Sequence, residues 1–253
     1  MGTIITVTNQ KGGVGKTSTS IALCSGLSNR GYKVLAVDID PQSNFSFTAG
    51  VNLLEGLTIY EAMKKEASSL QAIEQSNQGF DIIKGSLGLA GADMEFTQAG
   101  REYVLKEVLE PIKENYDFVV LDTPPALGIL TTNALTASDI VIVPMASEIY
   151  SLQGLSQLQA TINSVKRYCN SNLRIDGLLL TKYDHRAIIN RQLKESIEQI
   201  AEQLGTRLYK TTIRDAVAVK EAQFMQGNIF IDIPKAKVTQ DYNNFIDEFL
   251  KGR

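Results

Sequence analysis

Short apolar segments rich in β-branched residues alternate along the chain with longer segments of helical periodicity. Each apolar segment is nearly continuous, which is typical of strands buried on both faces of a parallel sheet. The segments expected to form strands are Ile4–Thr8, Lys33–Asp38, Asp81–Lys84, Asp117–Leu121, Asp139–Val143, Gly177–Thr181 and Leu208–Thr212. The segments expected to form helices are Ser18–Asn29, Tyr103–Glu114, Ser151–Cys169 and Arg186–Leu204. This alternation predicts a doubly wound α/β fold, with a mostly parallel sheet flanked by helices, in a single domain over residues 1–253.

Composition narrows the classes of function that such a domain can carry. The chain has 25 Lys and Arg and 28 Asp and Glu residues, so its bulk charge predicts no polyanionic partner. Its two cysteines, Cys24 and Cys169, are too far apart for a CxxC site, and its single histidine, His185, excludes a zinc site built on several histidines. No apolar run reaches the ~18–20 residues of a membrane span. Since no secretion signal is evident either, we expect a cytoplasmic protein that does not contact a membrane.

A glycine-rich segment follows the first expected strand and precedes the first expected helix. Its last three residues, Gly15-Lys16-Thr17, fit the end of the phosphate-loop pattern GxxxxGK[ST], whereas Gln10 stands where that pattern begins with glycine. Glycines let successive backbone N–H groups converge on phosphate oxygens, Lys16 should reach the β- and γ-phosphates, and the Thr17 hydroxyl should bind Mg²⁺. The residues expected to contact the phosphates within one subunit are therefore Gly12, Gly13, Val14, Gly15, Lys16, Thr17 and Ser18.

Lys11 is a second lysine in this loop, and holding phosphate within one subunit does not require it. It is either a solvated loop lysine or a group that reaches the nucleotide of a partner subunit. The segment from Lys11 to Thr17 resembles the deviant Walker A motif of the ParA/MinD family of ATPases. That resemblance implies a homodimer around ATP in which Lys11 contacts the phosphates bound by the opposite subunit.

Two acidic segments follow later strands. Asp38-Ile39-Asp40-Pro41-Gln42-Ser43-Asn44 resembles the family's switch I, which implies that Asp40 serves hydrolysis and metal placement and that Asp38 supports it. The run from Phe118 to Asp122 has the Walker B form, in which the carboxylate binds Mg²⁺ generally through water, and Thr123-Pro124-Pro125 resembles switch II. The expected catalytic residues are Lys11, Lys16 and Asp40. The expected Mg²⁺ ligands are Thr17, Asp40 and Asp122.

Further segments resemble the ParA branch of the family and imply a partition ATPase. The segment Leu178 to Arg186 resembles the LLTxYDxR stretch of ParA proteins and should border the adenine, with Thr181 and Asp184 as candidate contacts. The resemblance implies non-specific DNA binding by the ATP-bound dimer, for which Arg186, Arg214 and Lys220 are candidates, although scattered cations are usually solvated. It also implies a ParB-type centromere-binding partner that stimulates hydrolysis, a plasmid, chromosome or mobile element as cargo, and a nucleoid-associated location.

Three other functions compete with this one. A MinD-like ATPase for placing the division site would end in a basic amphipathic helix, but the apolar stripe of Phe245, Phe249 and Leu250 has mainly acidic neighbours, which favours a terminal helix packed on the core. A nitrogenase-iron-protein-like reductase needs paired cysteines at strand ends, but Cys24 lies within one expected helix and Cys169 is the last residue of another. A metabolic P-loop enzyme would have no need of Lys11.

Overall fold

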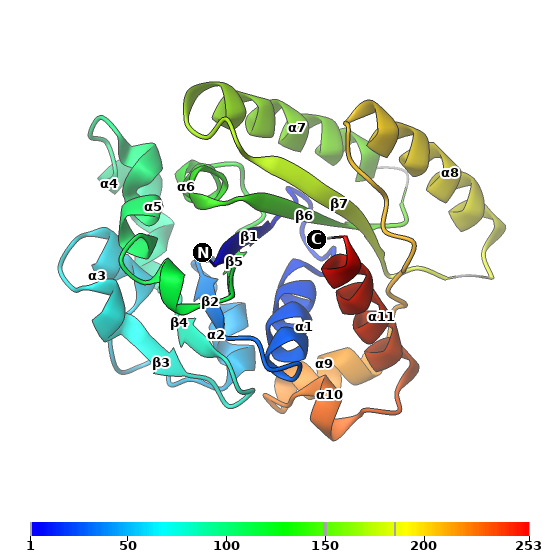
Figure 1. Ribbon diagram of the computed structural model, residues 1–253, viewed down its shortest axis with the longest axis horizontal. Coiled ribbons are helices and arrows are strands. Elements are labelled where there is room, and N and C mark those ends of the chain that lie inside the picture. The colour runs from blue at the N-terminus through cyan, green and yellow to red at the C-terminus, as the bar shows by residue number, and fades with distance from the viewer. Residues whose placement is uncertain (1, 149–150, 185, 253) are drawn as a thin grey trace.

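The computed structural model describes residues 2–148, 151–184 and 186–252, and it shows a seven-stranded sheet with the order β3-β4-β2-β5-β1-β6-β7 (Figure 1). All neighbouring strands are parallel except β3 and β4, which pair antiparallel. The strands are β1 (Thr3–Val7), β2 (Val34–Asp38), β3 (Ile73–Gln75), β4 (Asp81–Ile83), β5 (Phe118–Asp122), β6 (Ile140–Ala146) and β7 (Arg174–Thr181). The predicted doubly wound, mostly parallel α/β fold is confirmed.

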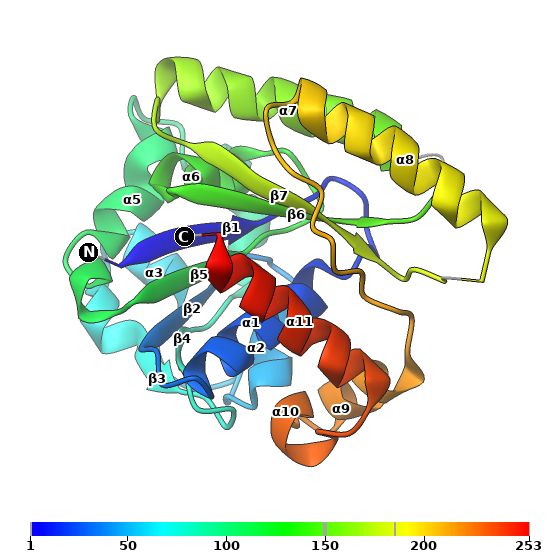
Figure 2. The same ribbon diagram turned by 45° about the vertical axis from the view of Figure 1, so that its right-hand side comes forward.

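Helices cover both faces of the sheet (Figures 1 and 2). One face packs against α1 (Lys16–Ser28), α2 (Asn44–Ala49), α9 (Val217–Phe224), α10 (Ile229–Asp232) and α11 (Lys237–Lys251). The other face packs against α3 (Ile59–Met63), α4 (Ala92–Glu95), α5 (Val104–Leu109), α6 (Ile129–Ala137), α7 (Ser151–Tyr168) and α8 (Ile188–Gln203). Short 3₁₀ turns complete the chain: η1 (Ser69–Ala72), η2 (Leu87–Gly91), η3 (Arg101–Tyr103) and η4 (Lys113–Asn115).

The continuous apolar strands explain this two-sided packing. Along β5, Phe118 and Val120 belong to the core beneath α1 and α11, whereas Val119 and Leu121 belong to the core beneath α3 to α6. Successive side chains of a strand point to opposite faces, so a strand without polar alternation must be covered on both.

Two of the sequence-based segment assignments differ from the structure. Leu208–Thr212 is not a strand: it runs along the edge of β7 but makes only one isolated parallel bridge, between Leu208 and Leu178. The predicted helix Tyr103–Glu114 is divided, because Pro111 follows the end of α5 and cannot donate a backbone N–H to continue it. The short strand β3 was not anticipated, since its three residues are only partly buried and give no apolar run.

The C-terminal helix α11 packs on α1, as the acidic surroundings of its apolar stripe had suggested (Figure 2). Phe245, Ile246 and Phe249 are fully buried, and the Phe245 ring meets the Tyr209 ring edge-on with centroids 4.9 Å apart. Across the described residues, every helix is too short or too polar to traverse a lipid bilayer.

We expect Phe245→Ala to lower the free energy of unfolding by about 3–5 kcal/mol, because it leaves a cavity between α11 and the sheet. Denaturant titration followed by circular dichroism measures the change. Lys251→Ala, on the exposed end of the same helix, is the control and should leave stability unchanged. Equal midpoints for the two variants would contradict the packing role of α11.

Candidate functional site

The segment between β1 and α1 forms a loop at the carboxyl edge of the sheet. Gly13 and Gly15 have φ angles of 71° and 81°, in the left-handed region that glycine adopts without steric strain. Gly15 is the N-cap of α1, a helix that is buried along most of its length and has no acidic residue in its first turn. The loop and the first turn of α1 can therefore offer backbone N–H groups and the positive end of the helix dipole to an anion.

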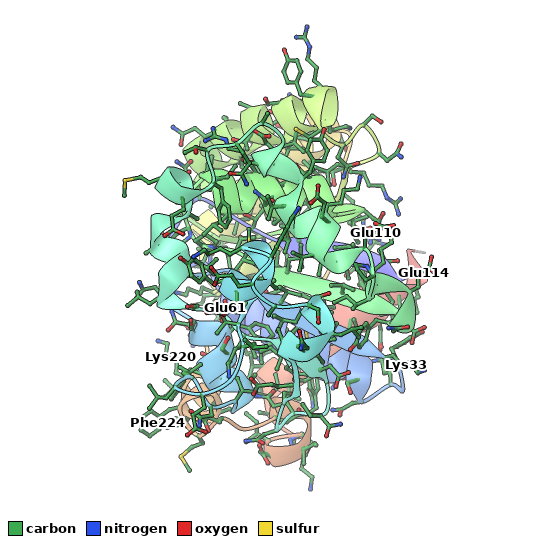
Figure 3. The ribbon with its side chains drawn as sticks, turned by 90° about the vertical axis from the view of Figure 1, so that its left-hand side faces the viewer. Lys33, Glu61, Glu110, Glu114, Lys220 and Phe224 are labelled. Atoms are coloured by element: carbon green, nitrogen blue, oxygen red, sulfur yellow. The ribbon has the colours of Figure 1, made fainter. Side chains whose placement is uncertain are left out.

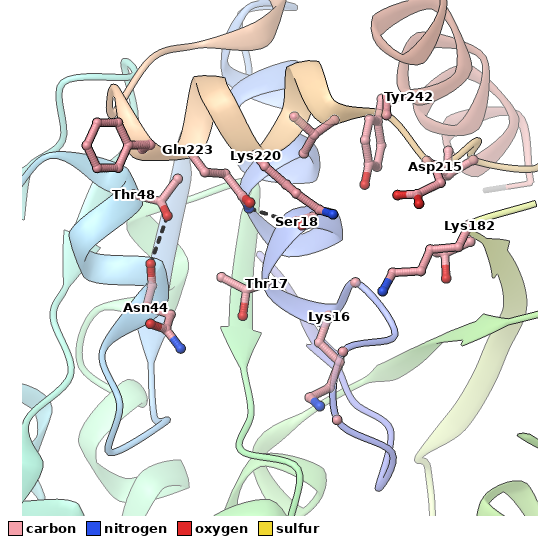
Figure 4. Close-up of a pocket in the computed structure, with 18 of the residues that line it drawn as sticks. Lys16, Thr17, Ser18, Asn44, Thr48, Lys182, Asp215, Lys220, Gln223 and Tyr242 are labelled. Atoms are coloured by element: carbon pink, nitrogen blue, oxygen red, sulfur yellow. Dashed lines mark hydrogen bonds between the residues drawn. The ribbon is translucent and has the colours of Figure 1, made fainter.

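A cavity of about 560 Å³ lies over this loop, between the carboxyl ends of the strands and α9 (Figure 4). Figure 3 shows α9 residues Lys220 and Phe224 on the opposite side of the molecule from Lys33 and Glu114, which precede β2 and β5. The cavity is therefore at the strand edge where doubly wound sheets bind their ligands.

Lys16 lies in the floor of the cavity and is 7% exposed. Its Nζ donates a hydrogen bond to the backbone oxygen of Lys11, 3.3 Å away. Burial lowers the pKa of the Lys16 ammonium, while the nearby carboxylates of Asp122 and Asp40 counteract that effect. A ligand phosphate would replace part of the hydration that this cation has lost.

Two buried carboxyl groups, Asp38 and Asp122, are register partners at the ends of β2 and β5. Asp122 accepts hydrogen bonds from Thr17 Oγ1 at 2.8 Å and from Ser20 Oγ at 2.7 Å. Asp38 accepts bonds from the backbone N and the Oγ of Ser46 at 2.9 and 2.7 Å. Burial raises the pKa of Asp38 to about 6, and burial together with the charge of Asp38 raises the pKa of Asp122 to about 7. The charge of Lys16 lowers the pKa of Asp122 but does not offset the effects of burial and of Asp38.

The oxygen atoms beside the loop suit Mg²⁺. Thr17 Oγ1 and the Asp122 carboxylate are in direct contact, and Asp40 lines the same cavity as Thr17. Asp40 caps its own turn by accepting the backbone N–H of Gln42 at 3.0 Å. Among the residues that the structure describes, no three His, Cys, Asp or Glu side chains cluster as a self-sufficient metal site. Mg²⁺ commonly takes one or two carboxylates and completes its shell with water and phosphate oxygens, so this donor set fits it.

Lys11 does not line the cavity that its own loop builds. Its ammonium instead forms an ion pair with Glu148, which follows β6. Its backbone N–H donates to Asn9 Oδ1 at 3.0 Å, and Asn9 Nδ2 donates to the oxygen of Pro144 at 2.8 Å. The buried Asn9, which sequence analysis did not assign, thus joins the loop to β6; the only local signal is a polar residue directly after an apolar strand.

The far end of the cavity is built by residues that sequence analysis also did not assign. Ile213, Val219 and Tyr242 provide an apolar wall. Gln223 Nε2 donates to Ser18 Oγ at 3.0 Å and so ties α9 to the start of α1 (Figure 4). An apolar wall beside a phosphate-type loop can accept a nucleobase. Its members come from α9, α11 and the segment before α9, which are far from the phosphate loop in the sequence.

The two candidate adenine contacts are separated by the structure. Thr181 lines the cavity, and its hydroxyl donates to the backbone oxygen of Val14 at 2.8 Å. Asp184 lies in a neighbouring cavity of about 510 Å³ and pairs with Arg186, with 3.2 Å between Nε and Oδ1. The geometry therefore joins Thr181, but not Asp184, to the phosphate loop.

Comparison with known proteins identifies the family. A family model described as an AAA domain matches residues 2–175. The sporulation initiation inhibitor protein Soj of Bacillus subtilis is 39% identical over 251 residues, which is 98% of each chain. The chain belongs to the Soj/ParA family of partitioning ATPases. The family predicted from the phosphate loop is confirmed.

Solved structures of similar proteins agree with this membership. A putative plasmid partition protein from Borrelia burgdorferi, solved with bound AMPPNP, has a TM-score of 0.84 and 26% identity, with 100% of each chain covered. Cobyrinic acid a,c-diamide synthase from Mycobacterium smegmatis, solved with ADP and magnesium, has a TM-score of 0.87 and 30% identity, covering 99% of this chain and 95% of that one. The latter name denotes a different chemistry, which a shared fold does not transfer.

The candidate DNA-binding residues of this Soj/ParA chain fall into two places. Arg186 lines the second cavity, Lys220 lines the first, and Arg214 lines both. The Arg186 side chain is 92% exposed. Arg214 is held by Asp241 of α11 through two hydrogen bonds of 2.6 and 2.7 Å. Arg214 therefore shares one cavity with Arg186 and the other with Lys220, whereas Arg186 and Lys220 line different cavities. His185, the single histidine of the chain, lies outside the described residues.

Asp122→Asn should change stability in a pH-dependent way. The folded-state pKa of Asp122 is about 7, above the ~4 of an unfolded Asp, so the stability that the neutral form contributes is lost as pH rises from about 4 to 7. We compare the free energy of unfolding of the nucleotide-free Asn variant with that of the original chain. The difference in favour of the variant should be larger at pH 8 than at pH 5 by on the order of 2 kcal/mol. Denaturant titrations at both pH values measure this, with the exposed Asp184→Asn as control. The same difference at both pH values would refute the buried-charge account.

Proposed function

We propose that this chain is a partition ATPase that dimerises around ATP, binds DNA without sequence preference and hydrolyses ATP when a ParB-type partner stimulates it, so as to position a plasmid, chromosome or mobile element. It is an ATPase whose cofactors are ATP and Mg²⁺. We also propose that the whole chain acts as one domain in the cytoplasm, associated with the nucleoid.

One observation carries the dimer: the two lysines of the phosphate loop point to different places. Lys16 lies in the cavity floor, whereas Lys11 lies outside that cavity and contacts Glu148. The Lys11 ammonium therefore does not line the cavity of its own subunit. The Lys11 side chain is 31% exposed, so another subunit can reach it. In the dimer, the Lys11 ammonium would leave Glu148 and contact a phosphate of the partner's nucleotide instead. Each nucleotide site would then have a second cation.

The described side chains divide the work of phosphoryl transfer. Mg²⁺, when bound, would neutralise charge on the phosphate oxygens, with Thr17, Asp40 and Asp122 as its protein ligands or the acceptors of its water. Lys16 and the backbone N–H groups of residues 12–18 would hold the phosphates. Asp40, at the edge of the cavity, would orient the attacking water. Lys11 of the partner would stabilise the charge that develops in the transition state.

DNA is favoured over a membrane as the surface to which the dimer binds. The apolar stripe of α11 is buried against α1, so it is unavailable for insertion between lipids. The second cavity offers Arg186, Arg214 and Lys237, cations that can contact phosphates without reading sequence. Lys220 lines the nucleotide cavity, so it would contact DNA at the border between that cavity and the proposed DNA-binding surface.

Lys11→Ala and Asp40→Ala should separate assembly from turnover. Lys11→Ala removes the ammonium that crosses between subunits, so it should remain monomeric with a non-hydrolysable ATP analogue. Asp40→Ala keeps that ammonium and should dimerise with ATP while its hydrolysis falls by at least about 100-fold, the usual effect of losing a group that positions a reactant. Light scattering with nucleotide and a phosphate-release assay measure the two properties.

Lys106→Ala, on the opposite face of the sheet, provides the control and should behave like the original chain in both assays. The proposal fails if Lys11→Ala still dimerises and hydrolyses ATP at the original rate.

Sedimentation with non-specific DNA or with anionic vesicles, each with ATP, ADP or no nucleotide, tests the binding surface. We expect binding to DNA only with ATP, weakened by salt, and a salt slope smaller by about 1 for Arg186→Ala because one phosphate contact is lost. Arg174→Ala, at the opposite end of β7, is the matched control. Binding to vesicles but not to DNA would instead support the MinD-like function.

A further inference from the structure

Lys182, the residue directly after β7, has an unusual backbone conformation. Its φ is 51°, and within the described residues it is one of only four non-glycine residues with positive φ. Left-handed backbone is uncommon for a residue with a long side chain and is retained where its surroundings hold it. Here the preceding residue, Thr181, is fixed to the phosphate loop by the hydrogen bond of its Oγ1 to the Val14 oxygen at 2.8 Å.

This conformation directs the Lys182 side chain back toward the phosphate loop (Figure 4). Its Nζ lies 3.9 Å from the point that a Cβ on Gly13 would occupy. Lys182 also lines the cavity that contains Lys16 and Thr17. A second ammonium thus approaches the loop within the same subunit, from the β7 side, whereas Asp40 and Asp122 belong to the β2 and β5 side.

The Lys182 ammonium forms no ion pair within 4.0 Å among the described residues, in contrast to Lys11, which contacts Glu148. The charge of Lys182 contributes only at longer range to the lowered pKa of Glu148, after the larger effect of Lys11. The ammonium can therefore contact a ligand without breaking an ion pair. An ammonium beside a cluster of loop N–H groups repels them electrostatically unless an anion lies between. The ligand with that chemistry is a di- or triphosphate, and the loop is shaped for one.

We propose that Lys182 is a further phosphate-binding residue, whose ammonium contacts oxygens of the diphosphate portion common to ADP and ATP. The inference rests on the proposed function in that the cavity must hold a nucleotide. It differs from the role of Lys11, because Lys182 acts within its own subunit and therefore in the monomer. The Thr181–Val14 hydrogen bond would keep Lys182 at a fixed distance from the loop.

Binding of Mg²⁺-ADP to the monomer, measured by calorimetry at low and high salt, tests this inference. Lys182→Met keeps the aliphatic stem and removes the charge, and we expect it to bind ADP about tenfold more weakly at low salt, as loss of a charge-assisted hydrogen bond implies. The difference from the original chain should shrink at high salt, because screening weakens the lost attraction. Lys182→Arg should restore most of the affinity.

Two further variants separate charge from backbone effects. Lys182→Gly also removes the ammonium but relieves the left-handed backbone, so it should bind ADP as weakly as Lys182→Met. Lys65→Met is the matched control: Lys65 has a φ of 62°, and its side chain pairs with Glu107 away from the nucleotide cavity. It should bind ADP like the original chain.

Unchanged ADP affinity in Lys182→Met would overturn the inference. So would a loss that is independent of salt and not rescued by arginine, since this would show that Lys182 only braces the loop. These outcomes are distinct from failure of the proposed function, in which the original chain itself would bind neither ADP nor ATP.

Discussion

The free N–H groups at the start of α1 are the constraint on which the rest of the site depends. The body of this helix is buried, and its N-terminus opens into the cavity, so the partial positive charge there is directed at a ligand. The left-handed glycines Gly13 and Gly15 extend the same array of donors around the loop. Lys16 and Lys182 lie beside that array, and Asp40 and Asp122, at the ends of neighbouring strands, could hold a metal ion next to it.

The two carboxyl groups at the ends of β2 and β5 show how the sheet itself imposes this arrangement. Parallel register places Asp38 opposite Asp122, and strands buried on both faces leave neither group in contact with water. Hydrogen bonds from Ser46, Thr17 and Ser20 satisfy the oxygens but do not remove the repulsion. A divalent cation would remove it, so the binding of Mg²⁺ and the stability of the folded sheet are linked through these two side chains.

Sequence predicted the parts of the site that depend on local chemistry. The glycines, Lys16, Thr17, Asp40 and Asp122 follow individual strands, and a parallel sheet necessarily gathers such strand ends at one edge. Sequence failed where position depends on distant packing. Tyr242 reaches the cavity because α11 folds back onto α1, and Asp184 turns into the neighbouring cavity after the left-handed Lys182.

The extended segment after Leu208 shows the same limit on predicting the fold from the sequence. Its composition resembles that of a strand, yet its backbone bonds to β7 are too sparse to form a ladder, so it is free to diverge toward α9. The last forty or so residues thus close the cavity rather than widen the sheet, a distinction that depends on backbone pairing and not on apolar content.

The ion pair between Lys11 and Glu148 has a consequence for self-association. In the isolated subunit the amine already has an acidic neighbour, so a second subunit must displace an internal competitor before it gains a contact. In the proposed assembly, only a ligand with more negative charge than one carboxylate makes that exchange favourable, and a triphosphate meets this condition. Glu148 would thereby suppress pairing of empty subunits and make the supply of nucleotide the trigger for assembly.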